Sequence, residues 1–283
     1  MKGTILVTGA TGNVGSRVVD VAVAKGFRVR AAARHPEKIP AAKNVQPVKV
    51  DYDDPHTLDA ALAGVNRVFL VAPPLDPAAP EKLKPAIEKA KALGVEQIVF
   101  VSAFGADHNE KTPLRIIERA LMDSGVNYTI LRPNFFMENF SAGFAVPMIR
   151  NLGGIFLAAG DGKTSFISSR DIAAVAGVAF ARNLAGEAYN LTGPAALDHA
   201  EVARIISATA GKEIKYHAIS EEAMMKNARD MGVPEGAVQY LQILYSVVRA
   251  GYAAPVTDDV KQVTGKDPMT FEAFARANKA AWK

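Results

Sequence analysis

The ten residues "VTGATGNVGS", Val7–Ser16, decide the fold that we expect, because they space three glycines at intervals of three. The uncharged run Thr4–Gly9 has the composition of a buried strand, and Asn13–Lys25 has apolar residues at helical spacing. A glycine-rich turn between a strand and a helix is the dinucleotide-binding fingerprint. Its first glycine permits the tight turn, its second lets the backbone approach a pyrophosphate, and its third lets the helix pack closely on the strand. We therefore predict a dinucleotide whose phosphates face the amino end of the helix.

Strands and helices alternate along the first half of the chain. We expect strands at Thr4–Gly9, Arg28–Ala33, Val45–Val50, Arg67–Ala72, Gln97–Ser102 and Tyr128–Arg132. Helical patterns fall between them, at Asn13–Lys25, Pro55–Leu62, Pro80–Leu93 and Pro113–Ser124. This alternation predicts the α/β class, with a Rossmann doubly wound parallel sheet.

The second half of the chain is mostly helical in its pattern. We expect helices at Ser168–Ala181, Asp198–Ala210, Ser220–Met231, Pro234–Ala250 and Met269–Trp282, and a short strand at Glu187–Gly193. The chain then divides into a dinucleotide-binding Rossmann domain, residues 1–133, and a small, mostly helical substrate-binding lobe, residues 134–283. Part of this lobe, residues 165–192, is expected to pack back on the Rossmann domain.

Composition excludes several classes of function. The 283 residues include no cysteine, so disulfides, thiolate metal sites and cysteine nucleophiles are excluded. The five histidines have no ligand-like spacing with acidic residues, so we predict no metal. The net charge of +4 is spread along the chain without interleaved aromatics, which predicts no binding to nucleic acid. The longest apolar stretch, Ile172–Ala181, is too short to span a membrane, and we expect a cytoplasmic protein, as a monomer or homodimer.

The residue at the end of the second expected strand indicates which dinucleotide binds. An NAD site needs an acidic residue there for the ribose 2′-hydroxyl. This chain has Arg34 instead, with no acid before Glu37, and Lys38 lies within reach. A guanidinium binds a 2′-phosphate through two hydrogen bonds, so we predict NADP(H); a solvated loop arginine is the alternative. The predicted cofactor contacts at the first four strand ends are Thr8, Gly9, Ala10, Thr11, Gly12, Asn13, Val14, Gly15, Arg34, Lys38, Asp51, Tyr52, Ala72, Pro73 and Pro74.

Several motifs together carry a resemblance that covers nearly the whole chain. They include "TGATGNVG" (8–15), "ARHPEK" (33–38), "IVFVSAFGAD" (98–107), "YTILRPNFFMENF" (128–140) and "PVTDDVKQVTGKDPMTFEAFA" (255–275). With them the sequence resembles the NmrA-like branch of the atypical short-chain dehydrogenase/reductase family, which includes triphenylmethane reductase and NADPH-dependent quinone oxidoreductases. The resemblance implies NADPH at the glycine turn and Arg34. It also implies that the nicotinamide lies near Ser102, Ala103, Phe104, Pro133, Asn134 and Phe135.

The proton relay that most short-chain dehydrogenases use is missing. That relay is a tyrosine followed four residues later by a lysine, which lowers the pKa of the phenol. None of the seven tyrosines of this chain has such a lysine, and residues 113–125, "PLRIIERALMDSG", contain no tyrosine. Acceptors that need no enzymic proton at the moment of hydride transfer suit such a site. We therefore expect a flat, hydrophobic, electron-poor substrate, such as a quinone, an aromatic cation or an imine.

The stretch "RPNFFMENFSAGFAVPM", Arg132–Met148, supplies apolar and aromatic side chains for such a substrate. The predicted substrate contacts are Phe104, Phe136, Met137, Asn139, Phe140, Phe144, Met148, Tyr240 and Tyr245. For each aromatic of the stretch, a place in the ordinary core is the alternative. No residue is assigned to catalysis; the candidates are Ser102, His108 and Asn134.

Two functions fit these observations. The first is an NADPH-dependent reductase whose partner is a small hydrophobic aromatic substrate. The second is an NADP(H)-sensing regulator, which binds the cofactor without turnover and signals to a protein partner. The aromatic stretch favours the reductase, because a sensor needs no substrate cavity.

Overall fold

The computed structural model describes residues 2–40 and 42–283. The chain forms two compact units. The first unit consists of Met1–Pro133, Ser169–Asn190 and Gln262–Gly265. The second unit consists of Asn134–Ser168, Leu191–Lys261 and Lys266–Lys283.

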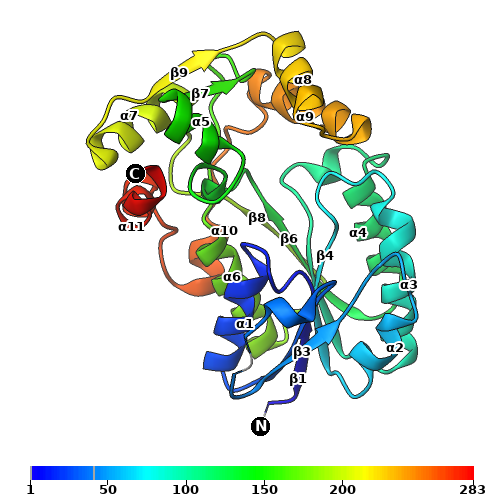
Figure 1. Ribbon diagram of the computed structural model, residues 1–283. Helices are drawn as coiled ribbons and strands as arrows, with labels where there is room; N and C mark the ends of the chain where they lie inside the picture. Colours follow the sequence, from blue (N-terminus) through cyan, green and yellow to red (C-terminus); the bar gives the residue numbers. More distant parts are fainter. Residues whose placement is uncertain (1, 41) are drawn as a thin grey trace. The chain divides into compact units, whose positions relative to one another are not determined.

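The first unit is built on a seven-stranded sheet with the strand order β3-β2-β1-β4-β5-β6-β8 (Figure 1). Its strands are β1 (Thr4–Val7), β2 (Arg28–Ala33), β3 (Val45–Lys49), β4 (Arg67–Val71), β5 (Gln97–Val101), β6 (Asn127–Pro133) and β8 (Glu187–Leu191). All neighbouring pairs from β3 to β6 are parallel. The strand order reverses at β1 and β4, and in such sheets ligands bind at the carboxyl ends of the strands beside this switch point.

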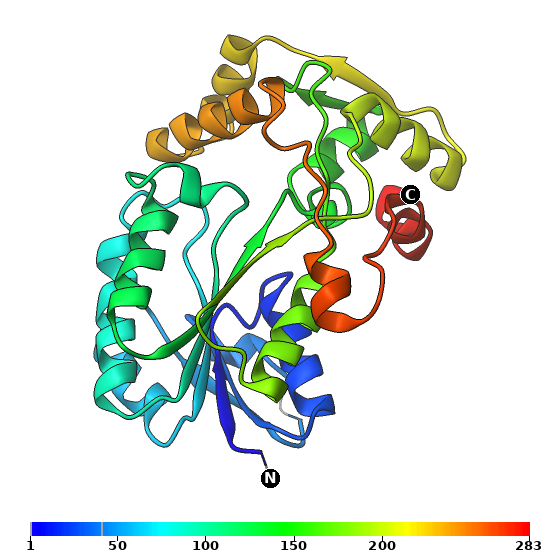
Figure 2. The ribbon, with the colours of Figure 1, turned by 180° about the vertical axis from the view of Figure 1, so that it is seen from behind.

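Helices cover both faces of this sheet, as the two opposite views show (Figures 1 and 2). The helices α1 (Gly15–Ala24) and α6 (Ser169–Arg182) lie on one face, and α2 (Thr57–Leu62), α3 (Ala79–Ala92) and α4 (Pro113–Asp123) lie on the other. Because both faces are covered, the central strands are mostly apolar after their first residues: Ile5, Val7 and Phe69 are fully buried. The predicted fold class is confirmed.

The second unit is mainly helical. It contains α5 (Ala145–Leu152), α7 (His199–Ala210), α8 (Glu221–Asp230), α9 (Glu235–Arg249) and α11 (Phe271–Ala277). Helix α10 (Asp259–Thr264) follows α9 in the sequence, and its residues from Gln262 onward belong to the first unit. Two short strands that the sequence did not predict, β7 (Gly154–Leu157) and β9 (Lys215–Ala218), pair in parallel. The expected closing helix is shorter than predicted, because α11 ends at Ala277 and a 3-10 turn, Lys279–Trp282, follows.

An aromatic core holds the second unit together. Phe140 packs edge-on against Phe166 and Phe271, with ring centroids 5.4 and 5.6 Å away. The indole Nε1 of Trp282 donates a hydrogen bond of 2.6 Å to the carbonyl of Phe140, which fastens the end of the chain to this core. Among the described residues, no helix combines the length and the apolar character that crossing a lipid bilayer requires.

Candidate functional site

The glycine turn between β1 and α1 has a geometry that only glycine satisfies at two positions. Gly9 has a φ of +62°, and a Cβ there would lie 2.7 Å from Cγ2 of Val71. A Cβ on Gly15 would lie 2.1 Å from the carbonyl oxygen of Gly9, so α1 begins directly against the turn. Gly12 donates its N–H to that same carbonyl at 2.9 Å. Side chains at Gly9 and Gly15 would therefore not fit between the strand end and the amino end of α1.

This amino end of α1 has unpaired backbone donors. Thr11 and Asn13 are exposed, and their N–H groups make no hydrogen bond to any described residue. No side chain caps α1, and its first turn has no acidic residue. Unpaired amides and the positive end of the helix dipole attract an anion, so the turn fits a pyrophosphate.

Arg34 and Lys38 lie just past the end of β2, and both are exposed. Their side chains make no hydrogen bond or ion pair within residues 2–40 and 42–283. Glu37, the acid of this turn, instead contacts His35 at 3.2 Å. The guanidinium of Arg34 is therefore exposed and unoccupied by any partner in the described chain.

Other predicted cofactor contacts fasten the strand ends to one another. The hydroxyl of Thr8, which is buried, donates to the carbonyl of Phe69 and accepts from the N–H of Val71, both at 3.0 Å. Tyr52 donates to the carbonyl of Val71 at 3.1 Å, and burial raises its pKa to about 12, so the phenol stays neutral. Ala10 is also buried and donates its N–H to Ala32. Thr8, Ala10 and Tyr52 therefore stabilise the carboxyl ends of the strands by hydrogen bonds within the chain.

The remaining residues predicted along this edge are more accessible. Asp51 is half-buried and accepts a 3.2 Å hydrogen bond from the N–H of Asp53. Ala72 and Pro73 are half-buried and Pro74 is exposed, in the turn that follows β4. This turn therefore keeps accessible surface at the end of β4.

The ends of β5 and β6 contain one of the candidates for catalysis, the buried hydroxyl of Ser102. Ser102 is 5% exposed, and no described residue forms a hydrogen bond with its Oγ. Its polar neighbour is the carboxylate of Glu118 on helix α4, which the hydroxyl approaches without forming a hydrogen bond of regular geometry. Backbone hydrogen bonds from Ser102 to Leu131 and from Phe104 to Pro133, of 2.8 and 2.9 Å, hold this segment beside β6.

A buried ion network that the sequence analysis missed lies next to Ser102. Arg132 donates from Nε and Nη2 to the two carboxylate oxygens of Glu118, each at 2.9 Å, and Arg115 adds a third bond of 2.8 Å. Arg132 Nη1 also donates to Asp107 at 2.7 Å. Burial raises the pKa of Glu118, but the contacts that Arg132, Ser102 and Arg115 make with its carboxylate outweigh burial and leave the pKa below its usual value. The contact from Ser102 is a close approach that falls short of a regular hydrogen bond.

A signal for this network was present in the sequence. Arg132 follows the buried apolar residues Ile130 and Leu131 in β6. Arg115 and Glu118 lie three apart in a helix whose other buried positions are Ile117 and Leu121. A charged residue at a position that the pattern assigns to the interior needs a buried partner of opposite charge.

The other two candidates for catalysis differ in their surroundings. His108 is exposed, with Nε2 4.0 Å from a carboxylate oxygen of Asp107. Asn134 is buried, and its amide donates to Ser165 and to the carbonyl of Ala253, both at 2.8 Å, while its oxygen accepts from Phe135. Since both of its amide hydrogens are used, Asn134 holds together segments of the second unit.

The predicted substrate contacts divide by burial. Met137, Phe140 and Tyr245 are at most 3% exposed and lie in the core of the second unit, and burial raises the pKa of Tyr245. The ordinary core accounts for these three. Half-buried or exposed positions, which keep surface for a ligand, are Phe104, Phe136, Asn139, Phe144, Met148 and Tyr240.

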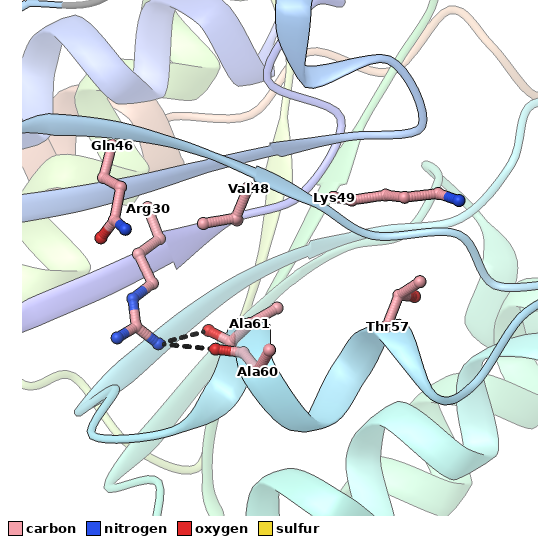
Figure 3. Close-up of a pocket in the computed structure, with 7 residues that line it drawn as sticks. All are labelled: Arg30, Gln46, Val48, Lys49, Thr57, Ala60 and Ala61. Carbon is pink, nitrogen blue, oxygen red and sulfur yellow. Dashed lines mark hydrogen bonds between the residues drawn. The ribbon is translucent and has the colours of Figure 1, made fainter.

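A cavity of about 400 Å³ lies elsewhere in the first unit, between β2, β3 and α2 (Figure 3). Arg30 points into it and donates to the carbonyls of Ala60 and Ala61 at 3.1 and 2.9 Å, at the carboxyl end of α2. None of its lining residues belongs to the predicted site, and we assign it no ligand. In the described part of the chain, no three or more His, Asp or Glu residues gather as a metal ion would require.

The sequence profile of the NmrA-like family matches residues 1–275. NAD(P)H azoreductase of Xenophilus azovorans is 37% identical over an alignment of 287 positions, gaps included, which covers 98% of this chain and 99% of the relative. Prestalk A differentiation protein A of Dictyostelium discoideum is 36% identical over 281 residues, 97% of this chain and 92% of the relative. The solved NADPH complex of an NADPH-dependent quinone oxidoreductase from Escherichia coli has a TM-score of 0.83 and 26% identity, over 96% of this chain and 98% of that one.

Proposed function

Because the chain belongs to the NmrA-like family, we propose that it reduces flat, hydrophobic, electron-poor aromatic compounds with NADPH. The broader statement follows from its relatives: the chain is an NADP(H)-dependent oxidoreductase, as the azoreductase and the quinone oxidoreductase indicate. The substrate class and the residues that hold cofactor and substrate are the proposal.

The observation that carries the proposal is the free guanidinium of Arg34 at the end of β2, together with the unpaired amides of the glycine turn at the end of the neighbouring strand β1. Three regions of the first unit then fit three parts of NADPH. The amides of Thr11 and Asn13 would receive the pyrophosphate, and Arg34 with Lys38 the 2′-phosphate. The hydroxyl of Ser102, which has no hydrogen bond of regular geometry in the described chain, would meet a polar group at the nicotinamide end.

NADPH, when bound, supplies the hydride. The chain supplies the binding surfaces and excludes water, which orients the reactants. Helix α4 offers no phenol for proton transfer, since Arg115 and Glu118 are its polar residues turned inward and both are ion-paired. The substrate class proposed here has products that water can protonate, so this site needs no relay.

Oxidation of NADPH followed at 340 nm tests the proposal against a panel of quinones, triarylmethane dyes, azo dyes and cyclic imines. We expect turnover with at least one quinone or dye, and slower turnover with NADH than with NADPH. Absence of turnover with every member of the panel would overturn the proposal.

The regulator remains the second candidate, because one relative at 36% identity is named for differentiation instead of catalysis. The same protein sample distinguishes the two. A regulator would show clearly different affinities for NADPH and NADP⁺ in a fluorescence titration, together with no turnover on the panel. A reductase would oxidise NADPH in the presence of at least one member of the panel.

A further inference from the structure

The loop after β5, Ser102–Asp107, is held against β6 by two different kinds of contact. The backbone of Ser102 and Phe104 forms hydrogen bonds with β6 at the start of the loop. The chain then turns at Gly105, which has a φ of +76°, into a short 3-10 helix, Ala106–His108. Beyond this turn, a side chain provides the contact: Asp107 accepts a 2.7 Å hydrogen bond from Arg132.

Arg132 connects the loop to helix α4 as well. Its side chain is 8% exposed and uses Nη1 for Asp107 and both Nε and Nη2 for Glu118. A bidentate pair fixes the plane of a guanidinium. Glu118 therefore fixes the orientation of Arg132, and Arg132 in turn fixes Asp107.

Glu118 is itself held from a second side. Arg115, on the same helix, donates to Glu118 at 2.8 Å and to Glu110 at 2.8 Å. Glu110 also pairs with Arg119 at the exposed end of the network. The network thus has an inner part, which touches the loop, and an outer part, which does not.

We propose that Arg132, oriented by Glu118, is a positioning residue for hydride transfer, because it clamps the loop Ser102–Asp107 against β6. This inference rests on the proposed function, in which this loop borders the nicotinamide. Hydride transfer depends on a distance that the loop would set, and a displacement of about 1 Å in such a geometry costs on the order of 100-fold in rate. Helix α4, which lacks the usual tyrosine and lysine, then contributes Arg115 and Glu118 to this network. In this proposal the network positions the loop and transfers no proton.

The variant Asp107→Asn tests this role, because it removes the charge that pairs the loop with Arg132 while the buried Arg132–Glu118 pair remains. The side chain of Asp107 is 31% exposed, so the folded protein should tolerate the change. Glu110→Gln is the matched control, since it also removes an arginine-bound carboxylate but acts on the outer part. Asp107→Glu keeps the charge and should recover part of the activity.

For each variant, kcat and KM are measured with NADPH and 1,4-naphthoquinone, along with NADPH affinity and the primary isotope effect on C4-deuterated NADPH. We expect Asp107→Asn to lower kcat about 10-fold or more and to raise the isotope effect, with NADPH affinity unchanged. Glu110→Gln should match the original protein in both quantities, even where its Tm falls.

Two results would overturn the inference, and they differ from failure of the proposed function. Asp107→Asn with an unchanged kcat and isotope effect would show that the pair is purely structural. Equal losses of kcat in Asp107→Asn and Glu110→Gln would show that any damage to the network has the same effect. Absence of NADPH oxidation by the original protein would instead refute the proposed function, and the positioning role with it.

Discussion

Glu118 in the first unit and His199 in the second are both buried titratable side chains, but their surroundings are opposite. Glu118 is fully buried and accepts three hydrogen bonds from two arginines. His199 is 1% exposed, its Nδ1 has no hydrogen-bond partner in the described residues, and aromatic rings surround it. The rings of Tyr216, Phe166, Phe140 and Tyr245 lie 5.4, 5.6, 6.0 and 6.4 Å from the imidazole.

The difference shows two ways in which a fold buries a group that can carry charge. The first unit keeps Glu118 ionised by pairing it, so the charge and its partners depend on one another. The second unit keeps His199 neutral, because burial lowers its pKa to about 4 and the nearby Asp198 offsets this only in part. Removal of the Glu118 carboxylate should therefore lower the stability of the first unit, and protonation of His199 should lower the stability of the second.

Glu118→Ala is the most damaging single change that this comparison predicts. It would leave Arg132 and Arg115 buried with one partner fewer, and removing one member of a buried ion pair typically costs about 3–5 kcal/mol. Urea unfolding followed by circular dichroism measures the loss. The control is Glu110→Ala at the exposed end of the same network, where the loss should be much smaller. Equal losses in the two variants would mean that burial does not distinguish the two glutamates.

Acid should destabilise the second unit through His199. The unfolded imidazole binds a proton near pH 6.5, but the folded one does so only near pH 4. Between these values the unfolded chain holds the extra proton, so the free energy of unfolding falls as the pH falls, by about 3 kcal/mol in total. Below pH 4 this contribution levels off, and above pH 6.5 the stability from His199 is fully present.

The pH effect is measured by urea unfolding at several pH values, with the fluorescence of Trp282, the single tryptophan, reporting on the second unit. His199→Phe removes the titrating group from its aromatic surroundings and serves as the matched variant. Its stability should change less between pH 6.5 and pH 4 than that of the original protein. Parallel pH curves for the two proteins would show that the buried imidazole does not control the acid response.

The fold and the tight glycine turn were predictable because their signals are local. Gly9 and Gly15 are dictated by contacts within a single turn, and Arg34 stands at a fixed distance along the chain from that turn. The alternation of strands and helices likewise decides the sheet without knowledge of distant residues. The small β7–β9 sheet was not predicted, because its strands have four residues each and pair across about 60 positions of sequence.

The parts of the site that sequence could not assign depend on distant partners. Phe140 and Phe144 are four residues apart and chemically identical, yet one is 1% and the other 41% exposed. Phe166 and Phe271, which bury Phe140, come from other parts of the chain. The pairing of Glu118 with Arg132 joins a helix to a strand in the same way. Periodicity alone does not distinguish a core aromatic from a ligand contact.

Arg34 differs from both Glu118 and His199, because its charge is exposed and has no partner in the described chain. Because it stabilises nothing in the described chain, its removal should leave the stability unchanged and weaken NADPH binding. A hydrogen bond to a charged group contributes about 1.5–3 kcal/mol, so Arg34→Ala should weaken NADPH on the order of 10- to 100-fold and leave NADH almost unaffected. Fluorescence titration measures both, and Arg28→Ala, exposed at the opposite end of β2, is the control. Equal losses for both cofactors would contradict the assignment of the 2′-phosphate.

Phe144 should give the smallest effect, and one that separates a substrate contact from an ordinary surface residue. With 41% of its surface exposed, Phe144→Ala should change the free energy of unfolding by no more than about 0.5 kcal/mol. If the ring contacts the substrate, the KM for 1,4-naphthoquinone should rise about 3-fold, which corresponds to partial loss of apolar contact. Leu152→Ala is the control, because Leu152 is 66% exposed at the end of α5 and has no predicted role in binding. A rise in KM with both variants, or with neither, would place Phe144 outside the substrate site.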